Sequence, residues 1–281
     1  MPLRFAIKTP PHHGAWTDYL DIWRAADDMD VFESAWNFDH FYPLTEPTTG
    51  PCMEAWVTLA ALAQVTSRIR IGCMVHGMHY RHPAVTANMA ASLDIISGGR
   101  FNLGLGAGWH EAESGAYGIE LGTVKERLDR FEEGIEVIVS LLGNETTTFS
   151  GEHYQLLDAR CEPKSIQRPH PPIVIGGKGK RRTLRAVARW ASMWDVNFIP
   201  PADLPEYLDV LAGHCAAVGR DVDDITIMAH VRWSSDLDSG GAAQQAAAYG
   251  DAGADVVVFS MVQPFAVARL EPLAESLRRL T

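Results

Sequence analysis

A glycine-rich turn followed by ring and carboxyl side chains is the segment of this sequence most suited to chemistry. An apolar run ends in Gly104, Gly106 and Gly108, and directly after it come Trp109, His110, Glu111 and Glu113. Glycines at a strand end let a ligand or another backbone segment approach closely. The spacing is not the dinucleotide fingerprint G-x-G-x-x-G, because Trp109 stands where its third glycine belongs. The segment therefore indicates another kind of ligand site, although the polar residues would also suit the first turn of a helix.

Asp39-His40 is a second candidate, at the end of another strand-like segment. An imidazole changes its charge near neutral pH, and a neighbouring carboxylate can orient it as a proton carrier or as a partner for a cofactor ring edge. We interpret His40 as the candidate catalytic residue and Asp39 as the group that orients it. The alternative from the residues alone is an aspartate that caps a helix beside a surface histidine.

A run of glycines and cations indicates a phosphate site. Gly176-Gly177-Lys178-Gly179 follows a strand-like segment, and Lys180-Arg181-Arg182 leads into a predicted helix. Backbone N–H groups in a glycine turn before a helix bind anions, whereas three cations there oppose the helix dipole. Such a local conflict often marks a functional site. We predict that the glycine turn binds phosphate; the alternative is a solvated basic surface.

Three histidines, His76, His79 and His82, raise the question of a metal site. Their spacing suits a helix poorly because Gly77 and Pro83 interrupt it, and the sequence contains neither H-E-x-x-H nor an H-x-H strand pair. We expect no metal here, and interpret these residues as the lining of an organic-ligand pocket or as plain loop structure.

Strand-like and helix-like segments alternate along the chain. The predicted strands are Arg4–Lys8, Phe32–Phe38, Ile69–Val75, Phe101–Leu105, Ile173–Ile175, Met193–Asn197, Ile225–Val231 and Val256–Ser260. The predicted helices are Thr17–Met29 (capped by Thr17), Glu54–Thr66, Pro83–Ile96, Lys125–Leu142, Arg181–Ala191, Leu204–Val218, Ala242–Asp251 and Pro264–Leu280. A hairpin over Thr146–Leu157, turning at Ser150-Gly151, interrupts the alternation after the fourth strand. Eight such units predict an α/β fold, a (β/α)8 TIM barrel with its chemistry at the carboxyl ends of the strands; a doubly wound open sheet is the alternative.

Composition narrows the class of protein. The chain has 281 residues, 47% apolar and 21% charged, which suits one globular domain over residues 1–281. Its net charge of −11 argues against general nucleic-acid binding. The sequence has no apolar run long enough to span a membrane and no signal peptide, and its four cysteines form no C-x-x-C pair. We therefore expect a cytoplasmic protein without membrane or nucleic-acid partners.

These segments together resemble the luciferase-like flavin and deazaflavin oxidoreductases over almost the whole chain. The similar stretches are Asp39-His40-Phe41, Glu54–Leu59, Thr66–Gly72, Tyr80-Arg-His-Pro83, Leu93–Arg100, Gly104–Trp109, Tyr117-Gly118, Arg127-Leu128 and Pro171–Gly177. Gly-Ala-Gly-Trp and Tyr-Arg-His-Pro look most like the branch that uses coenzyme F420, a 5-deazaflavin; FMN-dependent relatives share much of the pattern. Two departures stand out. Sugar-phosphate dehydrogenases of the group carry a glutamate where Trp109 stands here, and this chain lacks the long insertion after strand seven found in bacterial luciferases.

The resemblance implies a luciferase-like (β/α)8 barrel with the cofactor ring at the strand ends. It implies ring contacts from Asp39 and His40, from the backbone of Met74, Val75 and His76, and from Gly106, Ala107, Gly108 and Trp109. It places the phosphate at Gly176, Gly177, Lys178 and Gly179. Deazaflavin members also have a non-proline cis peptide after strand three, here at about Met74–Val75, which presses a backbone bulge against one ring face.

The function that follows is a coenzyme F420-dependent oxidoreductase moving a hydride between the deazaflavin C5 and a small, largely apolar organic substrate. His40, oriented by Asp39, would be the polar partner of the ring or of the substrate proton. Tyr80, His110, His76 and Trp109 would wall the substrate side. We also expect a homodimer. The alternatives are an FMN-dependent monooxygenase fed by a separate reductase, a metal-dependent barrel hydrolase and a non-catalytic flavin-binding relative.

Overall fold

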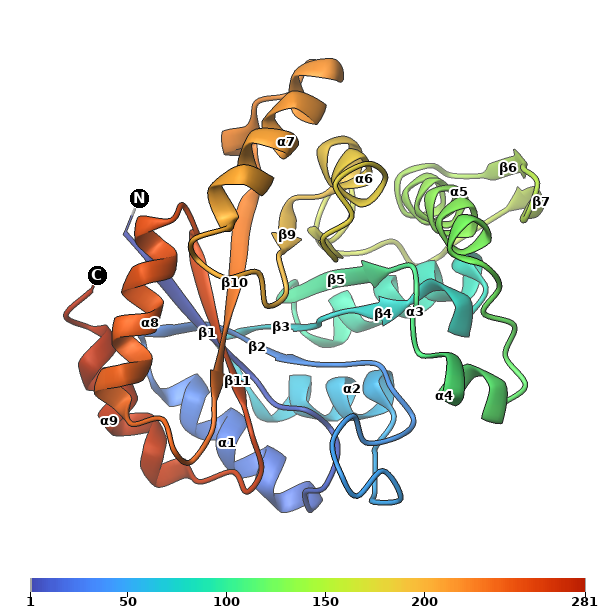
Figure 1. Cartoon of the computed structure of the whole chain (residues 1–281). Coiled ribbons are helices and arrows are strands. Elements are labelled where there is room, and N and C mark those ends of the chain that lie inside the picture. The colour runs from blue at the N-terminus through green and yellow to red at the C-terminus, as the bar shows by residue number, and fades with distance from the viewer. Residues whose placement is uncertain (1, 281) are drawn as a thin grey trace.

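The computed structural model describes residues 2–280, whose parallel strands close into a barrel surrounded by helices (Figure 1). The barrel strands are β1 (Arg4–Lys8), β2 (Phe32–Asn37), β3 (Arg70–Cys73), β5 (Phe101–Gly106), β8 (Ile173–Gly176), β9 (Met193–Asp195), β10 (Thr226–Trp233) and β11 (Val256–Met261). Each pairs in parallel with the next, β3 pairs with β5, and β11 returns to β1. This closure confirms the predicted (β/α)8 barrel and excludes the alternative, a doubly wound open sheet.

Helices follow the strands as predicted and cover the outside of the barrel. They are α1 (Trp16–Asp28), α2 (Ala55–Val65), α3 (Pro83–Ile96), α5 (Val124–Gly143), α6 (Thr183–Trp190), α7 (Leu204–Ala217), α8 (Ser239–Asp251) and α9 (Leu270–Leu277). Shorter turns are α4 (Glu111–Ala116) and the 3-10 helices η1 (Met78–Tyr80), η2 (Val222–Asp224) and η3 (Val267–Arg269). None of the helices within residues 2–280 is both long and apolar enough to cross a membrane.

Five predicted helix starts differ from the observed ones by one to three residues, and the predicted start of the last helix differs by six. The first helix begins at Trp16 rather than Thr17, because the Asp18 carboxylate accepts a hydrogen bond from the Ala15 N–H at 2.9 Å and so satisfies the free donor at this end. The last helix begins at Leu270 rather than Pro264. There, the Gln263 side chain accepts from the Phe265 N–H at 2.9 Å, a local bond that competes with helix formation.

The predicted third strand, Ile69–Val75, is divided. β3 ends at Cys73, the peptide bond between Met74 and Val75 is cis, as the resemblance implied, and the chain rejoins the sheet as β4 (His76–Gly77) beside β5. β5 must be free of side chains here, since a Cβ on Gly104 would lie 1.8 Å from the Cys73 carbonyl oxygen. Glycine at this position therefore lets the bulge lie directly against the neighbouring strand.

Two apolar layers hold the barrel. The larger lies between strands and helices, and a smaller one fills the barrel interior with Ala6, Trp36, Met74, Val174, Met228, Val256 and Val258. Alternation along β1 places Phe5 and Ile7 in the outer layer and Ala6 inside. Residues two positions after the interior ones, such as Lys8, therefore stand at the mouth of the barrel.

The hairpin predicted after the fourth strand is present. β6 (Thr147–Ser150) and β7 (Gln155–Ala159) are antiparallel and lie outside α5, away from the barrel (Figure 1). The connecting loop covers residues 151–154 rather than Ser150-Gly151 alone. Glu133 of α5 fixes it by accepting hydrogen bonds from the backbone of Glu152 and His153 at 2.9 and 3.0 Å.

Candidate functional site

A cavity of about 640 Å³ opens at the carboxyl ends of the strands. Most of the residues predicted for the site line it: Asp39, His40, Met74, Val75, Tyr80, Gly106, Ala107, Gly108, Trp109, Gly176, Gly177 and Gly179. Three predicted residues, His76, Lys178 and His110, are not part of the wall. Lys8, His79, Arg127 and Asp195 line it as well and were given no role in the cavity from the sequence, apart from His79 as a possible pocket residue.

One wall of the cavity is bare backbone. Gly106, Gly108, Gly176 and Gly177 face it, and a Cβ on Gly106 would lie 2.6 Å from the Val75 side chain. Gly108 and Gly177 have φ angles of +86° and +119°, which residues with side chains rarely adopt. Glycine at these positions lets the Val75 and His79 side chains pack closely against the backbone and leaves main-chain atoms in the cavity wall.

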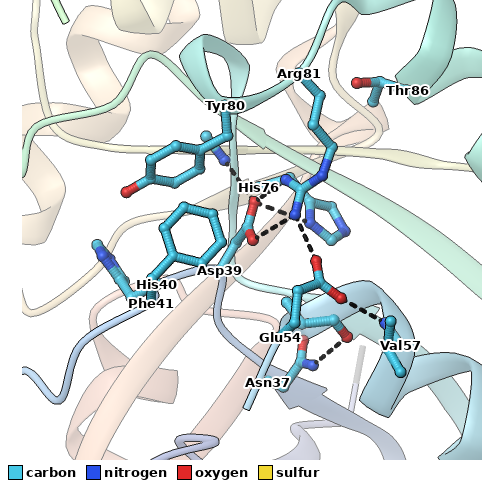
Figure 2. Close-up of polar contacts among 12 residues, drawn as sticks. Asn37, Asp39, His40, Phe41, Glu54, Val57, His76, Tyr80, Arg81 and Thr86 are labelled. Atoms are coloured by element: carbon cyan, nitrogen blue, oxygen red, sulfur yellow. Dashed lines mark hydrogen bonds and ion pairs between the residues drawn. The ribbon is translucent and has the colours of Figure 1, made fainter. Parts of the chain in front are cut away.

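Asp39 binds Arg81 instead of orienting His40, which corrects the prediction. Both carboxylate oxygens of Asp39 accept from the guanidinium, at 2.6 and 3.1 Å, and Oδ2 also accepts from the Gly77 N–H at 3.3 Å. Arg81 extends to Glu54 at 2.5 Å, so that it stands between two carboxylates (Figure 2). Consecutive residues of an extended chain point to opposite sides, which keeps the Asp39 carboxylate away from the His40 ring.

The Asp39 carboxylate is poorly suited to carrying a proton. Burial opposes its charge, yet contacts with His76 and Arg81 hold its pKa well below the usual range. Burial also lowers the pKa of His76, so Arg81 is the lasting positive partner. Asp39 therefore organises the wall by linking β4, Arg81 and the segment after β2.

Glu113, which was interpreted from the sequence only as a residue of the first turn of a helix, holds His40. Its Oε2 lies 2.8 Å from His40 Nδ1, and Tyr80 Oη donates to the same oxygen. Its Oε1 accepts from the backbone N–H groups of Phe41 and Tyr42, the latter at 2.9 Å. The side chain is fully buried. Burial opposes its ionisation, but hydrogen bonds from His40, Tyr80 and Phe41 prevail and lower its pKa to about 2.

His110 has the helix role that was the alternative for this segment. It is the N-cap of α4, and its Nδ1 accepts from the Glu113 N–H at 3.0 Å. This hydrogen bond helps to hold Glu113 in the position from which its carboxylate contacts His40. Trp109 is 60% exposed at the rim, with its ring centroid 5.5 Å from that of His40. The polar turn after the glycines thus both starts a helix and builds the site.

His76, His79 and His82 do not converge. The His76 ring is stacked on Trp56 of α2, with 3.9 Å between the ring centroids, behind the cavity wall. The prediction that its side chain lines the substrate site is therefore wrong. His79 lines the cavity beside Ser114 at 3.2 Å, and His82 caps α3. Within residues 2–280, no group of three His, Cys, Asp or Glu side chains is placed to hold a metal ion.

The predicted phosphate turn lies between the main cavity and a basic groove of about 850 Å³. The groove is lined by Lys125, Leu128, Gly179, Lys180, Arg181, Arg182, Thr183 and Arg185, three of which also line the main cavity. Lys180 pairs with Glu206 at 2.5 Å, and Arg182 pairs with Asp129 at 2.8 Å. In the described chain, Lys178 and Arg181 form no ion pair, and the Lys178 and Gly179 N–H groups form no hydrogen bond.

A chain of polar residues crosses the barrel from β9 to β11. Asp195 Oδ1 lies 2.8 Å from His230 Nε2, and His230 Nδ1 lies 2.9 Å from Ser260 Oγ. His230 and Ser260 were recognised at strand ends from the sequence, but no role followed, because their pairing requires the barrel to close.

A closed parallel barrel with a polar, glycine-walled cavity at the carboxyl ends of its strands is the arrangement of (β/α)8 enzymes. The chain belongs to the luciferase-like monooxygenase family, whose model matches residues 3–278.

Among curated proteins, an uncharacterised protein of Mycobacterium tuberculosis is 31% identical over 185 residues, 62% of this chain and 64% of that protein. The alignment thus spans less than two thirds of that relative. An F420-dependent glucose-6-phosphate dehydrogenase of Microbacterium testaceum is 30% identical over 237 residues, 83% of this chain and 69% of the relative. Among solved structures, an F420-dependent secondary alcohol dehydrogenase in complex with an F420-acetone adduct superposes with a TM-score of 0.91 at 17% identity and 100% coverage of both chains, which shows the shared fold.

Proposed function

We propose that this protein is a coenzyme F420-dependent oxidoreductase acting on a small organic substrate. The observation that carries the proposal is the glycine-walled cavity, whose lining includes Met74 and Val75 of the bulge, His40, and Gly176, Gly177 and Gly179 of the predicted phosphate turn. Relatives named for F420-dependent dehydrogenation support it.

The residues present fit a deazaflavin with a phosphorylated side chain. The backbone of Met74 and Val75 and the segment Gly106–Trp109 would hold the flat ring, because both line the cavity and the glycines among them leave main-chain atoms in its wall. The turn Gly176–Gly179, ahead of α6, would bind the phosphate through its N–H groups. Coenzyme F420, when bound, supplies a two-electron hydride carrier.

His40 is the chain's own group for handling a proton. The Glu113 carboxylate fixes the proton on His40 Nδ1, which leaves Nε2 free to exchange one with a ligand in the cavity. Tyr80 and the two backbone donors hold Glu113 in place. Asp39 and Arg81 act as positioning residues. His40 thus keeps the role of proton carrier, Glu113 takes over from Asp39 the role of orienting it, and Asp39 positions the cavity wall.

The experiment is an anaerobic assay of the purified protein with F420 and a panel of small alcohols, followed by the reverse reaction with the matching ketones and aldehydes. Reduction or oxidation of F420 without oxygen supports the proposal. Failure to turn over either cofactor form with any member of the panel counts against it.

An FMN-dependent monooxygenase is the second candidate, favoured by the family to which the chain belongs. It predicts oxygen consumption with reduced FMN and an external reductase, and no turnover with F420. The homodimer and the cytoplasmic location remain predictions from the sequence.

A further inference from the structure

A second cavity, of about 780 Å³, adjoins the first at the barrel mouth. The two share Lys8, Phe38, Leu44 and Phe198 as a common wall. The second is lined by the carboxyl ends of β1, β10 and β11, which lie side by side in the barrel (Figure 1), and by the segments that follow β1, β2 and β11. A ligand there would lie next to the wall that the second cavity shares with the first.

Two cations and a hydroxyl lie at the same level on these strands. Lys8 of β1 is in register with Ser260 of β11, and Arg232 of β10 is in register with the same serine. Side chains in register on parallel strands leave the sheet on the same side. All three line the second cavity, so Lys8 and Arg232 flank Ser260 across its inner wall.

Neither cation has a counterion in the described chain: Lys8 and Arg232 form no hydrogen bond or ion pair through their side chains. Asp195 is the principal negative charge acting on Lys8, but in the described residues the two form no ion pair, and Asp195 Oδ1 accepts from His230 and from the Asn197 N–H, both at 2.8 Å. Burial lowers the pKa of Lys8, which shows what its charge costs without a partner.

The acidic residues of the cavity do not supply that partner. Asp18 accepts from the Ala15 N–H at 2.9 Å, and Glu46 accepts from the Thr48 N–H at 3.1 Å, so each carboxylate is engaged with its own backbone. The remaining wall is largely apolar and includes Phe38, Leu44, Phe198, Met261 and Val262.

We propose that Lys8 and Arg232 bind the anionic group, a carboxylate or a phosphate, of a substrate whose apolar body lies against Phe38, Leu44 and Phe198. The role of this group as part of a substrate rests on the proposed oxidoreductase function; the anion site itself rests on the two cations. The substrate class is thereby narrowed from a largely apolar molecule to an apolar acid.

The test compares ligands that share a phenyl ring and differ in whether the attached group is anionic or neutral. Binding of benzoate, phenyl phosphate and benzyl alcohol is measured by ligand-observed NMR, with and without saturating F420. The proteins are wild type, Lys8→Met, Arg232→Met and Arg160→Met. Arg160 is exposed near the hairpin and lines neither cavity, so its variant is the charge-matched control.

Wild type and the Arg160 variant are expected to bind at least one of the two anions. Each cavity variant should bind that anion about tenfold or more weakly, because a charge-assisted hydrogen bond is lost. Whether benzoate or phenyl phosphate binds more tightly distinguishes the carboxylate from the phosphate. Benzyl alcohol should bind equally to all four proteins.

The proposal is overturned if neither anion binds wild type at millimolar concentration, or if the cavity variants bind the anions as wild type does. It is also overturned if both variants lose F420 affinity to the same extent as anion affinity, because the cations would then serve the cofactor. Should Lys8→Met fail to fold, the exposed Arg232 still provides the test. Anion binding without F420 separates this proposal from the oxidoreductase function.

Discussion

The site depends, at the scale of single residues, on which carboxylate reaches His40. Asp39 is its neighbour in sequence, yet Glu113 makes the contact from 73 positions away. Sequence adjacency suggested the wrong partner, because consecutive residues of an extended segment face opposite ways. No pattern in the sequence reports a contact between segments so far apart; the signal available was a glutamate three residues after the helix cap His110.

His40→Ala is expected to lower kcat by about 10²–10⁴, the range for a general acid or base. Affinity for F420 should change much less, because the proposed phosphate turn lies after β8, away from His40. Single-turnover hydride transfer and the thermal midpoint are measured together. A variant that melts early yet reacts at the normal rate would remove His40 from the mechanism.

Glu113→Gln should slow the same step by less than His40→Ala does, since the amide retains an acceptor but loses the charge. A loss in kcat with little change in KM is the expected signature. An unchanged kcat would show that His40 does not need a charged hydrogen-bond partner at Nδ1.

Glu113 also predicts how stability depends on pH. Its pKa is lowered from 4.5 to about 2, so its contribution to the free energy of unfolding is fully present above pH 4.5 and is lost as the pH falls through about 2. In urea unfolding at a series of pH values, the stability gap between wild type and Glu113→Gln should shrink over this window. A gap that does not change with pH would argue against the assigned ionisation.

At the scale of elements, the β3 bulge lies directly against β5 at Gly104, where a Cβ would have less room than at any other glycine of the described residues. Gly104→Ala should destabilise the fold by about 1–3 kcal/mol or more, as overpacking does, because the neighbouring atom belongs to the backbone and cannot rotate away. Gly143→Ala at the end of α5 is the control, since a Cβ there meets nothing within 4 Å. Thermal unfolding of the two variants compares them; equal midpoints would contradict the described packing.

The order of strands and helices could be predicted because apolar runs and helical spacing are local signals. The break after Cys73 could not be derived from that pattern, since Ile69–Val75 reads as one apolar run; only the family resemblance pointed to it. The alignment of Lys8, Ser260 and Arg232 was equally hidden, because it depends on the register of three strands far apart in the sequence.

At the scale of the whole molecule, an acidic chain keeps a basic groove beside its main cavity. A cofactor with an anionic tail extending beyond the phosphate would meet that groove. Among the cations of residues 178–182, Lys180 and Arg182 are already paired with carboxylates, whereas Arg181 in the groove and Lys178 beside it form no ion pair within residues 2–280.

Neutralising Lys178 and Arg181 together, by glutamine, should therefore weaken F420 binding, and the loss should be larger at low salt. Arg189→Gln is the control, because Arg189 belongs to α6 but lies outside the groove. Fluorescence titrations at two ionic strengths measure the effect. Identical affinities for the double variant and wild type would show that these two cations do not contribute to cofactor binding.

The preference of this protein for F420 over FMN is measured by an equilibrium titration of the purified wild-type protein with each cofactor. We predict that F420 binds well more tightly than FMN, because the groove beyond the phosphate turn can bind an acidic tail that FMN lacks. Equal affinities, or tighter binding of FMN, would contradict it.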